Sequence, residues 1–314
     1  MSALPKGLGL GCWQLGGAGS SSPTEEQAHE IVRGAYGLGI RHFDTAQSYG
    51  KGLSEQFLGG ILPELPEAFA ATKIHFAESE RETLERVAES RTRLRREIID
   101  LVYLHWPHTG KDLRPVLAGL EEARRRGWIR EIGVSNFSAE QMAAGSEVAR
   151  IDAHQIGYSL LLRYPENEVI PYCREHGIAF VAYTPLAQGL LTGKMARKPE
   201  FPPDDPRPRT LYYDAEVYPH VYTAVQGMME AARAHGTDLL HAAIGWVLRR
   251  PGVSASIAGV KSLEQLRGTF TPNFVAGGDA SWSSQAPLDE ELTSLSDDAM
   301  KHIPNIGNIF KHYP

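Results

Sequence analysis

The sequence has few cysteines and no long apolar segment. Cys12 and Cys173 are its only cysteines, and neither belongs to a CxxC pair, which argues against a disulfide framework and a cysteine-ligated metal site. No apolar run approaches the ~18 residues of a membrane-spanning helix, and the N-terminal segment lacks the basic flank and apolar stretch of a secretion signal. We therefore expect a cytoplasmic protein without membrane insertion.

An excess of positive charge is also missing. The net charge is −6, and lysine and arginine form no long stripe, so nucleic acid is not an expected partner. Hydrophobic residues make up 42% of the 314 residues and charged residues 22%, which is enough for a large core. A small molecule is the expected ligand.

Short segments rich in β-branched and aromatic residues alternate with longer amphipathic stretches, which is typical of βα units. Eight such units predict an α/β fold, a single (β/α)8 TIM barrel over residues 1–314, with an open doubly wound sheet as the alternative. GLGLG at 7–11 lacks the GxGxxG spacing of a dinucleotide fingerprint. The expected strands cover residues 8–13, 40–44, 69–73, 99–104, 129–134, 152–156, 178–183 and 255–258.

Four of the expected helices begin with a capping box, in which a hydroxyl residue precedes Gln or Glu by three positions. In the helix after Ser79, one stripe of Leu84, Val87, Ala88 and Leu94 is expected to face the sheet. The capping pairs are Thr24 with Gln27, Ser79 with Glu82, Ser138 with Gln141, and Ser262 with Gln265.

Two segments interrupt the alternation. Residues 192–216 contain five prolines, which predicts a long loop after the seventh strand and a candidate lid. Residues 271–314 are expected to form a linker, a short helix at 288–300 and a C-terminal tail over the barrel mouth. The alternative is that both segments are surface insertions.

The carboxyl ends of barrel strands carry the active site in this architecture, so the residues there are the candidates. They are polar or aromatic, where a purely structural strand end would tolerate almost any residue. In chain order they are Trp13, Asp44, Lys73, His105, Ser135 with Asn136, Gln155, Tyr183, and Gly259 with Lys261.

Four of these positions suit carbonyl reduction. Tyr49, in a short loop after Asp44, is a poor acid at its ordinary pKa of ~10, and an adjacent Lys73 would lower that pKa. Asp44 would hold Lys73 charged, and His105 would orient and polarise a carbonyl. Taken singly, an Asp–Lys pair is usually a salt bridge and a tyrosine usually packs half-buried; the joint placement of the four residues at strand ends is what favours the functional interpretation. His105 and His108 do not predict a metal site, because Pro107 breaks the helix that would align them.

Asp44, Tyr49, Lys73 and His105 lie in three of six motifs that together resemble the aldo-keto reductase superfamily. The resemblance runs from about residue 7 to about residue 270 and implies a barrel that binds a nicotinamide cofactor, generally NADPH, and reduces aldehydes or ketones. It also implies that Tyr49 is the general acid, tuned by Lys73 and Asp44, with His105 orienting the substrate. The motifs are FDTAQSYGKGLSE (43–55), ATK (71–73), LHWP (104–107), GVSNF (133–137), AYTPLAQGLLTGK (182–194) and IAGVKSLEQL (257–266).

The resemblance also implies the cofactor contacts. Lys261 and Ser262 would bind the 2′-phosphate, which favours NADPH over NADH, and Arg267 would reach the adenine or the phosphate. Thr269 stands where this branch of the family commonly has asparagine. Ser135, Asn136 and Gln155 would hold the carboxamide, Tyr183 would stack on the nicotinamide, Thr184, Leu186, Gln188 and Gly189 would line the pyrophosphate, and Gly259 and Gln265 complete the set.

The leading hypothesis is therefore an NADP(H)-dependent oxidoreductase that acts on a small carbonyl substrate, with Trp13 and Trp106 in an aromatic pocket. A redox-sensing regulatory subunit resembling potassium-channel β subunits is an alternative, as is a sugar dehydrogenase working in the oxidative direction. A metal-dependent hydrolase would need clustered ligands that the sequence lacks. Both a monomer and a homo-oligomer are compatible with the sequence.

Overall fold

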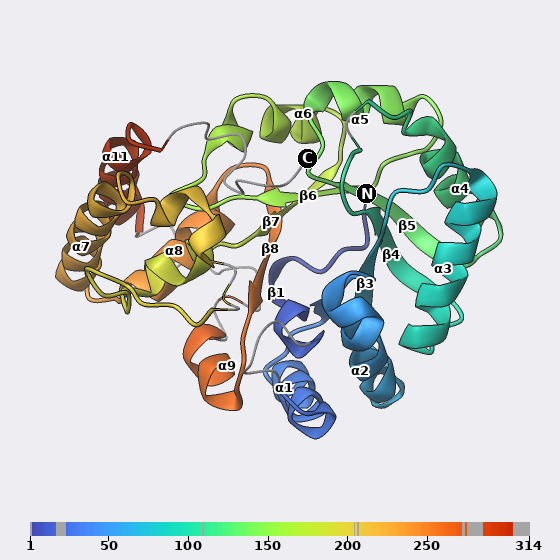
Figure 1. The fold of residues 1–314 in the computed structure, drawn as a ribbon, viewed down its shortest axis with the longest axis horizontal. Coiled ribbons are helices and arrows are strands. Elements are labelled where there is room, and N and C mark those ends of the chain that lie inside the picture. The colour runs from blue at the N-terminus through green and yellow to red at the C-terminus, as the bar shows by residue number, and fades with distance from the viewer. Residues whose placement is uncertain are drawn as a thin grey trace.

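The structure, a computed structural model, describes residues 2–16, 23–108, 110–203, 205, 207–271, 274 and 285–303. Its parallel strands close into a barrel in chain order, with β8 paired back to β1 (Figure 1). The predicted (β/α)8 barrel is thus confirmed. The strands are β1 (Gly7–Gly11), β2 (His42–Asp44), β3 (Phe69–Ile74), β4 (Ile99–Leu104), β5 (Ile129–Ser135), β6 (Ala153–Gly157), β7 (Ala179–Tyr183) and β8 (Val253–Gly259).

The predicted strands agree with these bounds to within a few residues. The first strand shows the difference that matters for the site. β1 ends at Gly11, two residues early, and Trp13–Gly16 forms a 3-10 turn, η1, that contacts α2 and the turn carrying Tyr49. β8, which closes the barrel against β1, begins at Val253 and pairs with β1 up to Gly259.

Helices surround the barrel, and α7 and α11 lie side by side at one edge (Figure 1). The predicted capping boxes at Thr24 and Ser138 are complete, whereas Ser79 and Ser262 only accept a hydrogen bond from the third helical N–H. The helices are α1 (Glu25–Gly37), α2 (Leu53–Ile61), α3 (Glu80–Leu94), α4 (Arg114–Arg125), α5 (Ala139–Ser146), α6 (Val169–Glu175), α7 (Tyr218–Ala234), α8 (Leu239–Arg249), α9 (Leu263–Thr269) and α11 (Ala286–Met300).

The predicted apolar stripe of α3 is only half correct. Val87 and Leu94 are fully buried, but Leu84 and Ala88 are partly exposed, and Thr83 is buried instead. The physical reason is α4: a Cβ on its Gly119 would lie 2.5 Å from the Thr83 Cβ, so the two helices approach closely at these small residues.

The proline-rich segment contains short structure that the sequence did not predict. Two 3-10 turns, η6 (Arg207–Arg209) and η7 (Leu211–Tyr213), follow the turn η5 (Ala187–Thr192), and the Tyr213 hydroxyl donates to the Gln188 carbonyl at 3.4 Å. The described residues between 193 and 217 contain no α-helix or strand, as the prolines predict. Asp204 and Pro206 lie outside the described residues. The role of this segment as a lid stays a prediction.

The C-terminal helix begins two residues earlier than predicted, at Ala286, with Pro287 in its first turn. α11 packs on α7, and the Arg249 guanidinium of α8 pairs with the Asp289 carboxylate at 2.6 Å. The expected linker at 272–273 and 275–284 and the expected tail at 304–314 lie outside the described residues. None of the described helices is long and apolar enough to cross a membrane.

Candidate active site

The barrel brings the four predicted catalytic residues, called the tetrad below, together at the carboxyl ends of its first strands. Asp44 ends β2, Lys73 lies near the end of β3, and His105 follows β4. Tyr49 opens the turn η2 (Tyr49–Gly52). The Asp44 and Lys73 side chains are almost fully buried, so their charges interact with little screening by water.

Lys73 is the centre of this cluster. Its ammonium donates to Asp44 Oδ1 and, at 2.9 Å, to the Thr45 carbonyl, and it lies 3.3 Å from the Tyr49 hydroxyl. These three contacts use all three of its N–H donors. The Thr45 carbonyl was missed by sequence reasoning, because a main-chain acceptor leaves no signal in the side-chain pattern.

The pKa values follow from burial and from these charges. Burial alone would lower the pKa of the Lys73 ammonium, but the Asp44 and Tyr49 contacts outweigh it and raise that pKa. Burial raises the pKa of the Tyr49 hydroxyl, and the Lys73 charge offsets only part of the effect. The expected lowering of the Tyr49 pKa is therefore not found, because desolvation of the phenolate exceeds the attraction of Lys73.

His105 is held as a neutral imidazole. Burial, and then the charge of Lys73, keeps its pKa well below the ordinary value. Its ring lies edge-to-face with the Tyr49 ring at 5.8 Å between centroids, and its Nδ1 is 3.4 Å from the Ser48 hydroxyl. A neutral imidazole here can donate one hydrogen bond to a carbonyl oxygen beside Tyr49. The Ser48 contact was not predicted from the sequence.

The residues expected to contact the cofactor carboxamide form hydrogen bonds with one another and with tetrad residues. The Asn136 amide donates to the His105 carbonyl and to Ser135 Oγ, each at 3.1 Å, and accepts from the Tyr183 hydroxyl at 2.7 Å. Gln155 donates instead to Asp44 Oδ2 at 2.8 Å. Asn136 adopts a φ of +64°, a left-handed conformation that asparagine tolerates better than most residues.

The segment after β7 turns tightly. Positive φ angles occur at Thr184, Ala187, Gln188 and Gly189, and the Ala187 and Gly189 N–H groups donate to the Thr184 and Leu186 carbonyls, each at 2.9 Å. A Cβ added to Gly189 would meet no heavy atom within 4 Å, so open space lies beside it. Leu186 is partly exposed. This open space beside Gly189 is where the pyrophosphate of a dinucleotide is expected.

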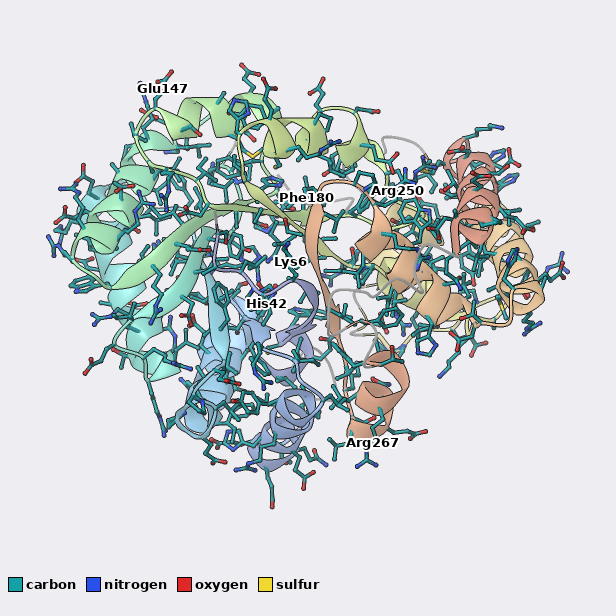
Figure 2. All side chains as sticks on the ribbon, turned by 180° about the vertical axis from the view of Figure 1, so that it is seen from behind. Lys6, His42, Glu147, Phe180, Arg250 and Arg267 are labelled. Atoms are coloured by element: carbon teal, nitrogen blue, oxygen red, sulfur yellow. The ribbon has the colours of Figure 1, made fainter. Side chains whose placement is uncertain are left out.

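The residues expected around a 2′-phosphate lie at the start of α9. The Lys261 N–H donates to Gln265 Oε1 at 2.8 Å, and the Gln265 N–H donates to Ser262 Oγ at 3.2 Å. Gln265 therefore serves as a helix cap. Arg267 is exposed on α9 at the edge of the molecule (Figure 2).

Gly259, at the end of β8, faces the side chain of Gln14. A Cβ at this position would lie 2.0 Å from Gln14 Oε1. The glycine thus leaves room for Gln14 of η1 beside the barrel mouth.

The expected substrate residues differ in exposure. Trp13 is 38% exposed in η1, and the Trp106 ring stacks on His105 with 6.3 Å between centroids. Trp106 therefore lies beside the tetrad, and Trp13 lies on the turn that contacts η2. Both can supply an apolar wall for a substrate.

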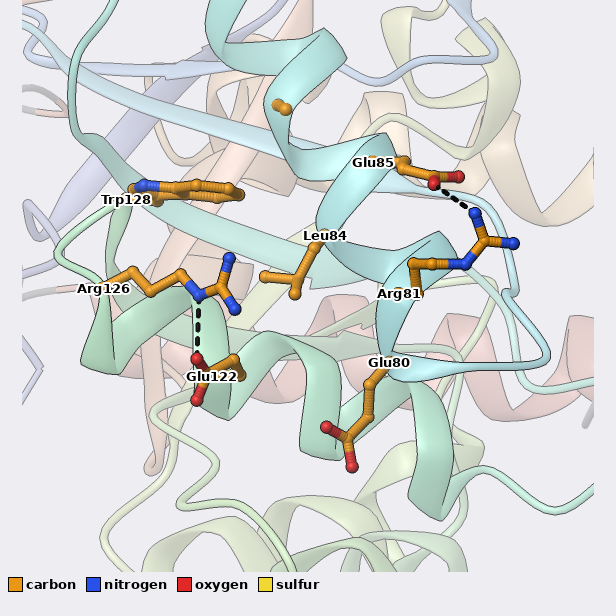
Figure 3. Close-up of a pocket in the computed structure, with 8 residues that line it drawn as sticks. Glu80, Arg81, Leu84, Glu85, Glu122, Arg126 and Trp128 are labelled. Atoms are coloured by element: carbon orange, nitrogen blue, oxygen red, sulfur yellow. Dashed lines mark hydrogen bonds and ion pairs between the residues drawn. The ribbon is translucent and has the colours of Figure 1, made fainter.

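A surface pocket lies elsewhere, between α3 and α4 (Figure 3). Its walls carry the Trp128 indole and two ion pairs, Arg81 with Glu85 at 2.9 Å and Arg126 with Glu122 at 2.8 Å. No tetrad residue lines it, so this pocket is separate from the candidate active site. Within the described part of the chain, no group of three or more His, Cys, Asp or Glu residues could hold a metal ion.

Known proteins of one family are similar to this chain in sequence. The model of the aldo/keto reductase family matches residues 7–273. Aldo-keto reductase YhdN of Bacillus subtilis is 33% identical over 272 residues, 82% of this chain and 82% of the relative. NADH-specific methylglyoxal reductase of Escherichia coli is 28% identical over 286 residues, 83% of this chain and 87% of the relative.

Among solved structures, the glycerol dehydrogenase AKR11B4 from Gluconobacter oxydans has a TM-score of 0.81 and 30% sequence identity. The match covers 98% of this chain and 94% of that one. The resemblance inferred from the six motifs is confirmed, and the chain belongs to the aldo/keto reductase family.

Proposed function

We propose that the protein reduces an aldehyde or a ketone to an alcohol with a nicotinamide cofactor, and that Tyr49 is the proton donor. The observation that carries this proposal is the buried Lys73 ammonium, which bonds Asp44 and lies 3.3 Å from the Tyr49 hydroxyl. A cation in that place stabilises the phenolate that forms when Tyr49 gives up its proton.

Each residue of the tetrad has one role in the proposed reaction. A bound nicotinamide cofactor supplies the hydride. Tyr49 donates its hydroxyl proton to the carbonyl oxygen, and Lys73 stabilises the negative charge left behind. Asp44 keeps Lys73 charged and in place. His105, neutral at pH 7, donates a hydrogen bond to the same carbonyl oxygen and orients it toward Tyr49.

For the cofactor we propose NADPH in preference to NADH, with Lys261, Ser262 and Arg267 on the 2′-phosphate side. The positive charge of two of these side chains supports this preference. The name of the Escherichia coli relative, an NADH-specific enzyme, makes a parallel measurement with both cofactors necessary. The residues at the nicotinamide and pyrophosphate would be Ser135, Asn136, Tyr183, Thr184, Leu186, Gln188 and Gly189, and Gly259 and Gln265 would complete the cofactor contacts. Gln155 was expected at the carboxamide, but its amide is bonded to Asp44.

A second candidate is oxidation of a small alcohol or of a sugar hemiacetal by the same residues in the reverse direction. The similarity to a glycerol dehydrogenase favours it. In that direction Tyr49 would accept the proton of the alcohol, and the same Lys73 charge would stabilise its phenolate form.

We also propose that residues 1–314 form one domain that acts on a small molecule. The packing of α11 on α7 and the Arg249–Asp289 ion pair support this, because they attach the C-terminal helix to the barrel helices.

The test is cofactor consumption by the purified protein with NADPH and NADH in parallel, over aromatic, aliphatic and sugar carbonyls, and with the oxidised cofactors over glycerol and sugars. Tyr49→Phe should lower turnover by about a hundredfold to ten-thousandfold and leave the thermal unfolding midpoint close to wild type. A folded Tyr49→Phe variant with full turnover would show that this hydroxyl is not the proton donor. Tight cofactor binding without any turnover would favour the regulatory-subunit alternative.

A further inference from the structure

Gln155 has a partner that the family resemblance does not explain. Its amide Nε2 donates to Asp44 Oδ2 at 2.8 Å, while Lys73 bonds the other oxygen of the same carboxylate. Gln155 and Asp44 are 2% and 3% exposed. The carboxylate is therefore held from both sides inside the barrel, where water does not compete for either bond.

The barrel interior makes this contact possible. Gln155 lies on β6, in register with Ser135 of β5, whereas Asp44 lies on β2. The residues in register with Asp44 are Gly11 and Ala71, which have small or no side chains. They leave the space beside the carboxylate to a long side chain from a distant strand.

We propose that Gln155 is a positioning residue for the reaction, which holds the Asp44 carboxylate in the orientation that keeps Lys73 beside Tyr49. This inference rests on the proposed function. A carboxylate bonded only through Oδ1 can rotate about its last side-chain torsion, and that rotation is a broad and soft one. A second bond through Oδ2 fixes it. An amide is suited to this role because it donates without adding charge to the Asp44–Lys73 pair.

The other titratable groups whose charges interact with Asp44 are Cys12, His42 and Tyr103. Burial raises the pKa of the Cys12 thiol and of the Tyr103 hydroxyl, and it lowers that of the His42 imidazole to about 4. All three are therefore neutral around pH 7 and above. A change in the pH dependence of kcat in this range reports on Lys73 and Tyr49.

The competing role is the one expected from the family, in which Gln155 contacts the cofactor carboxamide. The two roles differ in what the loss of the amide changes. A positioning residue affects kcat and its pH dependence through Lys73 and Tyr49. A cofactor contact affects the dissociation constant of the cofactor.

The experiment compares Gln155→Leu with wild type and with Gln47→Leu. Gln47 is a matched control, because it is a buried amide near the site that donates to the Arg86 carbonyl at 2.8 Å and to Ser90 Oγ at 3.0 Å, away from Asp44. Each variant is measured for cofactor dissociation constant by fluorescence titration, for kcat as a function of pH, and for thermal unfolding.

For Gln155→Leu we expect kcat to fall about tenfold or more. The decrease of kcat at high pH, which reports the loss of the Tyr49 proton, should move upward by about one pH unit. The reason is that Lys73 is held less firmly beside the phenolate. The cofactor dissociation constant should stay within about twofold of wild type. Gln47→Leu should leave the pH profile in place. In an Asp44→Asn background, Gln155→Leu should have little further effect, since both act through one group.

Gln155→Glu gives a second, independent signature. It keeps the length of the side chain but places a carboxylate against Asp44, so kcat should fall further at neutral pH and recover as the pH is lowered and the introduced carboxyl becomes a donor. A merely structural role would produce no such recovery.

Two results would overturn the inference. One is a rise in the cofactor dissociation constant of tenfold or more with an unchanged pH profile, which would assign Gln155 to the cofactor. The other is wild-type kcat and pH dependence in a folded Gln155→Leu variant. Failure of the proposed function is distinguishable from both, because wild type itself would then show no turnover with either cofactor.

Discussion

Tyr49 is subject to two opposing influences that act at different stages of proton transfer. Burial raises its pKa and keeps the hydroxyl protonated at neutral pH, as a proton donor requires, while Lys73 opposes that rise. As the proton leaves, the growing negative charge interacts with the ammonium 3.3 Å away, where little water screens it. The lysine therefore contributes most to the transition state and less to the resting pKa.

Replacing Lys73 tests how far its charge lowers the pKa of Tyr49 and stabilises the phenolate. Lys73→Met should lower kcat for carbonyl reduction by about a hundredfold or more and move the high-pH limb of kcat upward, because the group that lowers the Tyr49 pKa is lost. The exposed Lys51, two residues after Tyr49, provides the control: Lys51→Met should keep kcat and its pH dependence. An unchanged pH limb in Lys73→Met would disprove the coupling between the two side chains.

Sequence reasoning could place the tetrad because each member stands at or just after a strand end, and a barrel brings strand ends together. It could not predict that Gln155 bonds Asp44. That contact depends on the small residues Gly11 and Ala71 beside Asp44, which leave room for a side chain from the other side of the barrel. The bond from Lys73 to the Thr45 carbonyl could not be predicted either, because every residue has a main-chain carbonyl. Residue identity thus predicts which residues belong to the site, and the packing around them determines which hydrogen bonds they form.

The turn that carries Tyr49 depends on a close contact between two glycines. Gly50 has a φ of +59°, and a Cβ there would lie 1.6 Å from the Gly16 carbonyl oxygen of η1. The main chain of η1 and η2 thus touches directly, which fixes Tyr49 relative to Trp13 at the barrel mouth. The strands were predictable from apolar periodicity, but this contact between two turns has no periodic signal.

Gly50→Ala should therefore destabilise the fold by ~2 kcal/mol or more and reduce kcat, because the added methyl group forces η1 and η2 apart and strains a left-handed residue. Gly37→Ala is the control, since a Cβ at that α1 position meets nothing within 4 Å, and it should be neutral or slightly stabilising. Urea unfolding and kcat of both variants make the comparison. Equal stability of the two variants would contradict the contact.

At the scale of the whole molecule, buried histidines such as His42 and His154 make the free energy of unfolding depend on pH. Burial lowers the pKa of His42 to about 4 and that of His154 to about 3. His42, which is labelled in Figure 2, lies inside the barrel next to Gly9. Neither of its ring nitrogens has a hydrogen-bond partner among the described residues. In the unfolded chain a histidine takes up its proton at about pH 6.5. Between these values the unfolded state binds more protons, so stability falls as the pH falls.

His42→Leu tests how much of this acid sensitivity comes from one ring. For His42 the window runs from about pH 6.5 down to about pH 4, and its width of about 2.5 units corresponds to about 3 kcal/mol of lost stability. Leucine has a similar volume and no proton to bind, so the variant should lose less stability than wild type over this range. Urea unfolding at pH 7, 5.5 and 4 measures the difference, with pH 7 as the baseline for any change in packing. Parallel curves for the two proteins would mean that His42 takes up its proton at about the same pH in the folded barrel as in the unfolded chain, which would contradict the lowered pKa.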